Sequence, residues 1–275
     1  MDRLKSKKTK LDKRSIYLRN LILMGLAGGK RGHIGSSMSL VEILRVLYDD
    51  ILRHNPKKKN SENRDRFILS KGHGCLALYA ILSDKGYFSK NKLKSFCKSS
   101  SILGGHPDKN IPGVETTTGS LGHGLSIGIG IALSLKIKRN KSKVYVVVGD
   151  GEMNEGSIWE GLMSASKHKL DNLVVIVDHN NLQTYGSPKD VAGLSNIKQK
   201  MESFGFKVKE VNGHSIKEIR KALKYNNKKK PLGVICKTVK GKGIDFAEDK
   251  LDWHHKANLD DLTIKNLKNS LNKIS

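Results

Sequence analysis

Short apolar runs alternate along this chain with longer stretches in which apolar residues recur at helical spacing. Four short runs rich in Val or Ile predict strands: 143–148, 172–178, 206–211 and 232–239. Helical spacing is found in these stretches: 37–52, 74–86, 156–170 and both ends of 198–223. Strands that alternate with helices predict an α/β fold, in which a parallel sheet is flanked by helices on both faces. No internal repeat and no Pro- or Ser-rich linker divides the sequence, so a single domain is expected over residues 1–275.

Two polar residues follow neighbouring predicted strands. Asp150 lies in a Gly-Asp-Gly turn directly after one apolar run, and Asn180 follows the next run, with an amphipathic helix between them. Because a βαβ connection brings the carboxyl ends of its strands to one edge of the sheet, these side chains are expected to lie close together. Mg²⁺ takes few protein oxygens and completes its coordination with phosphates of a ligand. The pair therefore predicts a magnesium site that binds a diphosphate.

The segment 149–183 resembles the thiamine diphosphate motif in the form that transketolases use. The resemblance implies that Asp150 and Asn180 coordinate Mg²⁺ together with the main-chain oxygen of Leu182. It also implies that Asn180 and Gly151 take part in binding the cofactor, where the missing Cβ of the glycine lets the backbone approach the diphosphate. Thiamine diphosphate and Mg²⁺ are thus the expected cofactors.

Four histidines lie in short segments that resemble the cofactor cleft of transketolases: His33, His73, His106 and His254. Imidazole suits such a site because it can donate, accept and titrate near neutral pH. By resemblance all four are catalytic: His73 and His254 lie near the diphosphate and the reacting carbons, and the other two contact substrate hydroxyls. His255 stands where the family commonly has Gly, so either the loop differs or this residue takes part. His123 and His168 are expected to be structural or surface residues.

A turn at Gly119, Ser120 and Leu121 opens a glycine-rich helix, and by resemblance the turn borders the cofactor. Glycine inside a helix costs about 1 kcal/mol relative to alanine, so several on one apolar segment suggest a close approach of another backbone. Four are found here: Gly122, Gly124, Gly128 and Gly130. The helix either lies at a subunit contact, as the resemblance implies, or packs within the core of this chain.

Two glutamates follow the Gly-Asp-Gly turn. Glu155 and Glu160 are consistent with the ordinary preference for acids near a helix N-terminus. By resemblance they join a hydrogen-bonded acidic network between the two active sites of a dimer, and Glu155 borders the cofactor. Both are therefore candidates for a subunit interface.

Charge and cysteine content limit the partners and the cellular compartment that we expect. The net charge of +25 invites a nucleic-acid interpretation, but the lysines are spread along the chain without zinc-finger spacing or an aromatic RNA-binding element. We expect no nucleic-acid partner; the positive field could steer phosphorylated sugars instead. The 3 cysteines form no CxxC pair, which favours a reducing compartment. Without a signal-peptide pattern or a long apolar span, the expected location is the cytoplasm, with no membrane contact.

The resemblance covers nearly all of this chain but only the first, diphosphate-binding domain of a full transketolase. The pyrimidine domain, whose Glu contacts the aminopyrimidine ring, is expected on a separate chain. The leading hypothesis is the N-terminal subunit of a split transketolase, which transfers a two-carbon ketol unit from a ketose or ketose phosphate to an aldose or aldose phosphate. An α2β2 heterotetramer with the pyrimidine-domain chain is expected. Which sugars react is left open.

Three alternatives remain at this stage. The α subunit of a 2-oxo acid dehydrogenase has the same magnesium motif, but the loops around His73 and His106 suit polyhydroxylated sugars better. Deoxyxylulose-phosphate synthases are possible relatives, although those are normally single long chains. A non-catalytic binding or regulatory homologue is disfavoured by the intact metal-ligand pattern and the four histidines.

Overall fold

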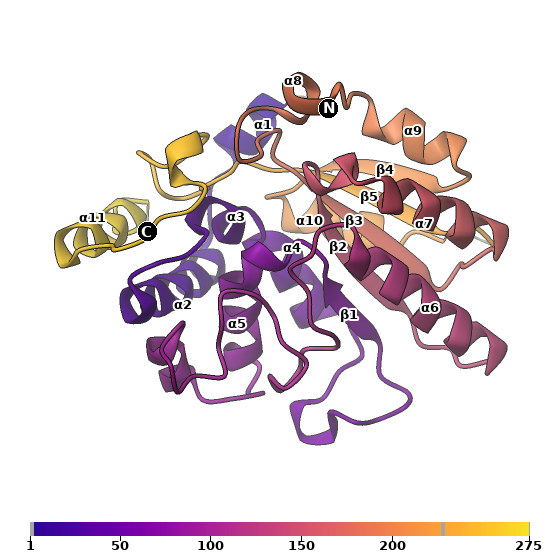
Figure 1. Ribbon diagram of the computed structural model, residues 1–275, viewed down its shortest axis with the longest axis horizontal. Helices are drawn as coiled ribbons and strands as arrows, with labels where there is room; N and C mark the ends of the chain where they lie inside the picture. The colour runs from indigo at the N-terminus through magenta and orange to yellow at the C-terminus, as the bar shows by residue number, and fades with distance from the viewer. Residues whose placement is uncertain (1–2, 227–228, 275) are drawn as a thin grey trace.

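The computed structural model describes residues 3–226 and 229–274, and its centre is a sheet of five parallel strands (Figure 1). The strand order is β1-β2-β3-β5-β4, and every neighbouring pair is parallel. The strands are β1 Arg66–Leu69, β2 Val144–Gly149, β3 Leu173–His179, β4 Lys207–Asn212 and β5 Leu232–Lys237. The predicted α/β fold with a parallel sheet is confirmed.

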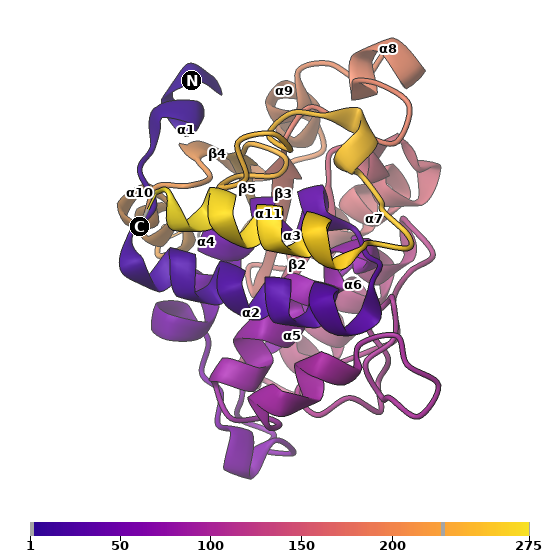
Figure 2. The same cartoon turned by 90° about the vertical axis from the view of Figure 1, so that its left-hand side faces the viewer.

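Helices cover both faces of this sheet (Figure 1). Their bounds are α1 Arg3–Lys8, α2 Lys13–Gly29, α3 Ile34–Ser39, α4 Val41–Val46, α5 Cys75–Asp84, α6 His123–Ile137, α7 Gly156–Lys167, α8 Pro188–Ala192, α9 Ile197–Ser203, α10 Ile216–Leu223 and α11 Asp261–Asn272. Late and early parts of the chain meet, since α11 lies beside α2 (Figure 2). No helix in the described part of the chain is long and apolar enough to cross a membrane.

Side chains along each strand point alternately to the two faces of the sheet, so the apolar residues form two separate cores. Val144 and Val146 of β2 pack with α6, α7 and α9 on one face, whereas Tyr145 and Val147 pack with α2, α4, α5, α10 and α11 on the other. Successive side chains of a strand point to opposite faces, and both faces are covered here. This explains why the strands read as nearly continuous apolar runs.

Most predicted elements are found close to their expected positions. The helix expected over 37–52 is instead divided: α3 ends at Ser39, α4 runs over Val41–Val46, and a π-helical turn follows at Leu47–Ile51. Elements that the pattern did not single out include β1, α2 and α11. The loops at the carboxyl ends of β1, β2, β3 and β5 share one edge of the sheet, and this edge holds the candidate site.

Candidate active site

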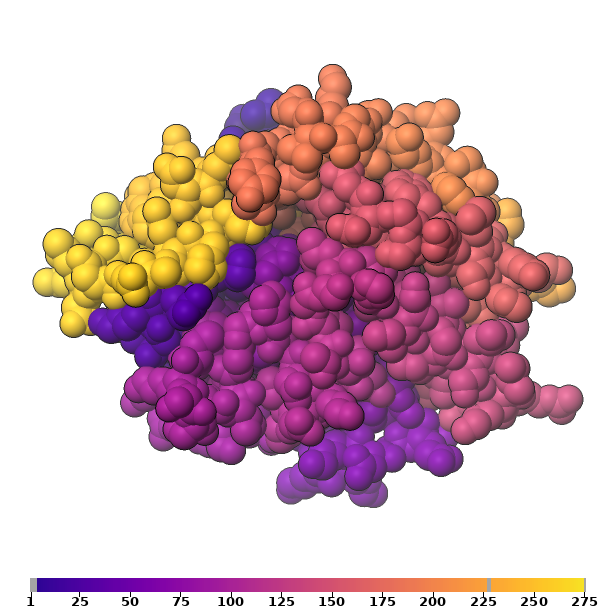
Figure 3. Space-filling model, viewed as in Figure 1, coloured from indigo at the N-terminus to yellow at the C-terminus, as the bar shows by residue number. Residues whose placement is uncertain are grey.

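A cavity of about 470 Å³ opens at this edge of the sheet. Segments far apart in the sequence surround it and come together on the face of the molecule shown in Figure 3. The predicted site residues that line it are His33, His73, His106, Gly119, Leu121, Asp150, Gly151, Glu155, Asn180, Leu182 and His254. Ser120 is exposed and is not among the lining residues. The structure thus gathers nearly all of the predicted set around one cavity.

Asp150 and Asn180 lie where the sequence predicted, at the ends of the neighbouring strands β2 and β3. Both are buried. The Asp150 carboxylate accepts hydrogen bonds from the backbone N–H groups of Gly151 and Asn181. The Asn180 side-chain oxygen accepts from the backbone N–H of Leu182 at 3.1 Å. Asn181 has a left-handed φ of 62°, which turns the chain sharply and helps to explain why a second Asn follows the first.

The charge around Asp150 fits a cation. Burial and, to a smaller extent, the nearby Asp178 carboxylate raise the pKa of its carboxyl to about 6, against the opposing effects of Asn181 and Lys71. A divalent ion beside Asp150 would offset both effects. In the described residues no group of three or more His, Cys, Asp or Glu converges on a metal position. The donor set for Mg²⁺ would therefore be one carboxylate, one amide oxygen and a main-chain oxygen, a hard-oxygen set that suits this ion.

The main-chain oxygen of Leu182 already has a partner in the structure. It accepts a hydrogen bond from Nζ of Lys240 at 3.1 Å. Lys240 follows strand β5 and is buried. Burial lowers the pKa of Lys240 to about 8, and the neighbouring Lys71 contributes in the same direction.

Two of the histidines are positioned by the end of β1 and by α5. His73 lies in a 3-10 turn over Gly72–Gly74, directly after β1 and before α5. The loop that carries His106 is held by α5, where the Tyr79 hydroxyl lies 3.0 Å from the Gly104 oxygen and 2.8 Å from the His106 oxygen. The Gly119 turn packs against both loops. A Cβ at Gly72 would meet the backbone of Gly119 at 3.0 Å, which explains the need for glycine at this contact.

The other two histidines are brought together by a backbone bridge between distant segments. Gly32 and Lys256 form an isolated antiparallel pair, with N–H to O distances of 2.9 and 3.1 Å. His33 follows Gly32, and His254 lies two residues before Lys256. The bridge therefore fixes the two loops side by side at the cavity.

The imidazole rings form one cluster with His33 at its centre. Ring centroids lie 5.3 Å from His33 to His73, 6.2 Å to His106 and 5.4 Å to His254. The rings of His73 and His254 are stacked with centroids 5.7 Å apart. His255 lies closest to His33, at 4.6 Å, although it is exposed. His255, which stands where the family commonly has Gly, therefore adjoins the cluster.

All four imidazoles are held in the neutral form near pH 7. Burial lowers the pKa of His33 to about 3 and that of His254 to about 4, with nearby cationic groups adding to the effect. Burial and Lys71 lower the pKa of His73 well below its usual value, and burial lowers the pKa of His106. A neutral imidazole has one donor and one acceptor nitrogen. Each ring can therefore give one hydrogen bond and receive another.

Three charged residues that were not predicted from the sequence belong to the site or adjoin it: Lys71 and Glu152 line the cavity, and Asp178 pairs with Lys71. Nζ of Lys71 lies 2.5 Å from the Asp178 carboxylate, and both side chains are essentially inaccessible to solvent. The Glu152 carboxylate accepts from the backbone N–H groups of Gly122 and Gly149 at 2.9 and 3.1 Å. The sequence around each of these residues could have indicated a place in the site. Lys71 lies in the His73 segment, Asp178 lies at the end of an apolar strand, and Glu152 follows the Gly-Asp-Gly turn.

The glycines of α6 resolve one of the open alternatives. A Cβ at Gly124 would meet the Ser70 Oγ at 2.5 Å, and one at Gly128 would meet Val146 at 2.5 Å, whereas Gly130 has nothing within 4 Å. Gly124 and Gly128 therefore pack against strands of this chain, and the helix is partly a core helix. Glu160, His123 and His168 are exposed and lie outside the cavity, whereas the exposed Glu155 lines it.

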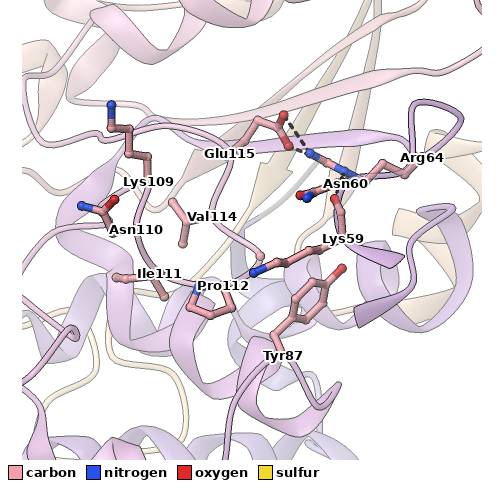
Figure 4. Close-up of a pocket in the computed structure, with 11 residues that line it drawn as sticks. Lys59, Asn60, Arg64, Tyr87, Lys109, Asn110, Ile111, Pro112, Val114 and Glu115 are labelled. Atoms are coloured by element: carbon pink, nitrogen blue, oxygen red, sulfur yellow. Dashed lines mark hydrogen bonds and ion pairs between the residues drawn. The ribbon is translucent and has the colours of Figure 1, made fainter. Parts of the chain in front are cut away.

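A second hollow of about 160 Å³ lies between the 59–64 and 109–115 loops (Figure 4). None of the predicted site residues lines it. Arg64 is engaged by Glu115, with nitrogen to oxygen distances of 2.5 and 3.0 Å. The side chain of Lys109 points away from Lys59 (Figure 4). Because its cations are paired or diverge, this hollow offers no convergent set of reactive groups, and we place the active site in the larger cavity.

Comparison with known proteins agrees with this geometry. Residues 12–273 match the family model described as transketolase, thiamine diphosphate binding domain. The chain is 43% identical over 229 residues to one of the subunits of an apulose-4-phosphate transketolase from Phocaeicola vulgatus, covering 82% of this chain and 81% of that protein. It is 36% identical over 227 residues to a 6-deoxy-6-sulfo-D-fructose transketolase subunit of a Clostridium species, covering 82% of each.

Among solved structures, this chain is similar to one part of longer transketolases. The transketolase from Campylobacter jejuni superposes with a TM-score of 0.87 and 35% sequence identity, covering 94% of this chain and 42% of that one. The present chain thus spans about two fifths of that longer transketolase, while it is comparable in length to the two relatives described above. The chain belongs to the transketolase family and corresponds to its N-terminal, thiamine diphosphate-binding part.

Proposed function

We propose that this chain is the diphosphate- and metal-binding subunit of a two-chain transketolase. It would transfer a two-carbon ketol unit between a ketose and an aldose, with thiamine diphosphate and Mg²⁺ as cofactors. The observation that carries the proposal is the single cavity in which Asp150 and Asn180 lie together with His33, His73 and His254. The curated relatives include enzymes named for phosphorylated and for sulfonated sugars, so a sugar with an anionic group is the substrate class that we favour.

Asp150, Asn180 and the Leu182 oxygen would hold the metal, and Gly151 and the Gly119 turn would border the diphosphate. When bound, thiamine diphosphate supplies the carbon nucleophile that carries the two-carbon unit. The roles left to this chain are binding, orientation and proton movement. Lys71 and Lys240 add positive charge next to the metal position, which favours a diphosphate there.

The neutral imidazoles would serve as a hydrogen-bonding surface for a polyhydroxylated substrate. The stacked pair His73 and His254 lies nearest the buried charges, so we assign these two to the reacting carbons. His33 and the more exposed His106 would contact hydroxyl groups further out. Because each ring is neutral, it can form hydrogen bonds with hydroxyl groups, and a ring whose unprotonated nitrogen faces the cavity can also accept a proton from one and return it.

A partner chain with the pyrimidine domain completes the proposed enzyme. Exposed apolar residues on the adjacent helices α6 and α7 offer a surface for it: Ile127 is 38% exposed, Met163 54% and Ile137 74%. Glu155 and Glu160 lie on or beside α7 and are exposed as well. We propose an α2β2 assembly of two such chains with two partners, in a reducing cytoplasm.

The test is a reconstitution with the pyrimidine-domain chain expected from a neighbouring reading frame. The purified pair should transfer a ketol unit from xylulose 5-phosphate to ribose 5-phosphate, or to a related sugar, only with thiamine diphosphate and Mg²⁺ present. Asp150→Asn should abolish Mg²⁺-dependent cofactor binding measured by calorimetry, because one of the two side-chain ligands loses its charge.

A matched control separates this effect from a general loss of charge. Asp50→Asn removes an exposed carboxylate that pairs with Arg220 away from the cavity, and it should bind the cofactor normally. Undiminished affinity in Asp150→Asn would refute the metal assignment. Full ketol transfer by this chain without a partner would refute the two-chain proposal.

A further inference from the structure

A buried charged network lies outside the lining of the cavity. Arg19 is 0% exposed, Glu42 1% and His214 3%. Two nitrogens of Arg19 donate to the Glu42 carboxylate at 2.6 and 3.0 Å. Nδ1 of His214 lies 2.7 Å from the same carboxylate. None of these three residues lines the cavity.

The network holds a short segment of backbone at both of its ends. The backbone N–H of Val239 donates to Nε2 of His214 at 2.9 Å. Nε2 is therefore the acceptor nitrogen of the ring, and Nδ1 carries the proton that is donated to Glu42. Nε of Arg19 donates to the backbone oxygen of Lys242 at 2.8 Å. The segment 239–242 is thus tied to α2 and α4 through side chains.

Lys240 lies inside that segment and reaches the active site. Its Nζ lies 2.6 Å from Nδ1 of His254 and donates to the Leu182 oxygen at 3.1 Å. An ammonium group can only donate, so Nδ1 of His254 must accept. The proton of the neutral His254 ring is then on Nε2, which lies 3.4 Å from the Thr184 hydroxyl. The orientation and the tautomer of His254 both depend on where Lys240 is held.

We propose that His214 is a positioning residue for His254 and acts through Val239 and Lys240, while Glu42 orients the His214 ring. His214 fixes the Val239 backbone, this backbone fixes Lys240, and Lys240 presents His254 to the cavity with Nε2 protonated. The consequence for turnover rests on the proposed function, whereas the tautomer of His254 does not. The charged groups that face Lys240 are Lys71, Asp150 and Asp178, and substitutions at His214 leave all three in place.

The first experiment uses two conservative variants of one residue in the full chain. In His214→Asn the amide can still donate to Glu42 but cannot reach Val239. In His214→Gln the amide oxygen can still accept from the Val239 N–H. We expect nitrogen-15 spectra of the histidine side chains to show the Nε2–H tautomer for His254 in the wild type. The His254 signals should shift in His214→Asn and stay near wild type in His214→Gln.

A second pair keeps the inference testable if a His214 variant does not fold. Lys240→Leu removes the donor to His254, and Lys240→Gln keeps a neutral donor. The His254 signals should change in the former and be largely retained in the latter. The inference would be overturned if the His254 signals were unchanged in both His214→Asn and Lys240→Leu. It would also be overturned if His254 in the wild type carried its proton on Nδ1.

Kinetics of the reconstituted pair separate positioning from stability. His214→Asn should lower kcat roughly tenfold to a hundredfold, since a displacement of about 1 Å can cost on the order of a hundredfold in rate, while His214→Gln recovers most of it. The control is Asp65→Asn. Asp65 is buried and is paired with Arg53 at 2.9 Å, and it belongs neither to the network of Arg19, Glu42 and His214 nor to the cavity. The substitution should lower the melting temperature without lowering kcat. A kcat that follows the melting temperature across all three variants would show a purely structural role. Absence of ketol transfer in the wild-type pair would count against the proposed function and leave the spectroscopic result standing.

Discussion

The imidazoles of His33 and His254 are partly buried near Lys240 and are held neutral, and this makes the stability of the fold depend on pH. The folded-state pKa of His33, about 3, lies below its unfolded value near 6.5. Between these values the unfolded chain binds more protons than the folded chain, so stability rises with pH across this window. His254, with a pKa of about 4, acts in the same direction.

We therefore expect the isolated chain to lose stability as the pH falls from about 6.5 towards 4. His33→Asn removes one of the contributing groups, so its melting temperature should fall less steeply over that range than that of the wild type. Melting curves at pH 4 to 7 test this directly. An equal slope in both proteins would show that His33 is not held neutral by its surroundings.

His255 gives a second prediction for a single residue. Its ring adjoins His33 and is exposed, which places it at the outer end of the imidazole cluster. His255→Gly should raise KM for xylulose 5-phosphate about threefold to tenfold, the effect of one lost hydrogen bond. KM for the shorter ketose L-erythrulose should change little, since it lacks the outer part of the substrate.

His168→Gly is the matched control for that variant, because His168 is also exposed but lies at the end of α7 outside the cavity. It should leave both KM values unchanged. Equal effects of His255→Gly on the two ketoses would show that His255 does not contact the outer part of the sugar.

The sequence predicted those residues of the candidate site whose chemistry follows from their local pattern, and most of them line one cavity. Asp150 and Asn180 directly follow apolar strands, and three of the four histidines lie beside glycines in short loops. Lys71, Asp178 and the pair of Glu42 and His214 could not be predicted in the same way. Each is buried only because its partner arrives from a distant element, and a sequence pattern does not show which lysine or glutamate will find one.

Helix α6 packs against the sheet on one side and is exposed to solvent on the other. Its Gly124 faces Ser70 at the end of β1, while Gly130 has no neighbour within 4 Å. In the isolated chain, Gly124→Ala should destabilise by about 1–3 kcal/mol, because the new methyl group would overlap Ser70. Gly130→Ala should stabilise by about 1 kcal/mol through helix propensity alone.

Urea denaturation of the two alanine variants measures this difference. The comparison is internally controlled, since both substitutions add one methyl group to the same helix. Equal changes in unfolding free energy would mean that the packing of Gly124 against β1 is looser than the structure shows.

At the scale of elements, the sequence predicted those with strong periodicity or an unbroken apolar run. The division of 37–52 into α3, α4 and a π-helical turn was not predicted, because every residue there is compatible with a helix and the break is set by packing. Ser39 ends α3 and donates to the buried Asp178 at 2.7 Å. Strand β1 was missed because only four residues of it, Arg66–Leu69, join the sheet.

For the whole molecule, the exposed apolar residues of α6 and α7 give a prediction about assembly. Ile127→Lys should weaken association with the pyrimidine-domain chain at least about tenfold, a change of about 1.4 kcal/mol in binding free energy. The isolated chain should fold as before, since Ile127 is 38% exposed in it. Light scattering after size-exclusion chromatography measures the complex.

Leu262→Lys is a matched control on the opposite side of the molecule (Figure 1). Leu262 is 65% exposed on α11, away from α6 and α7 (Figure 1). It should leave association unchanged. Loss of the complex in the Leu262 variant alone would place the contact on the C-terminal helix instead.

The backbone bridge between Gly32 and Lys256 also determines when the site can exist during synthesis. It closes a loop that contains most of the chain, and contacts of such long sequence separation form slowly and late. A ribosome-bound chain therefore completes β1, β2 and β3 well before His254 can reach His33. The edge that carries Asp150 and Asn180 forms first, and the imidazole cluster is completed only when the segment that carries His254 emerges and pairs with Gly32.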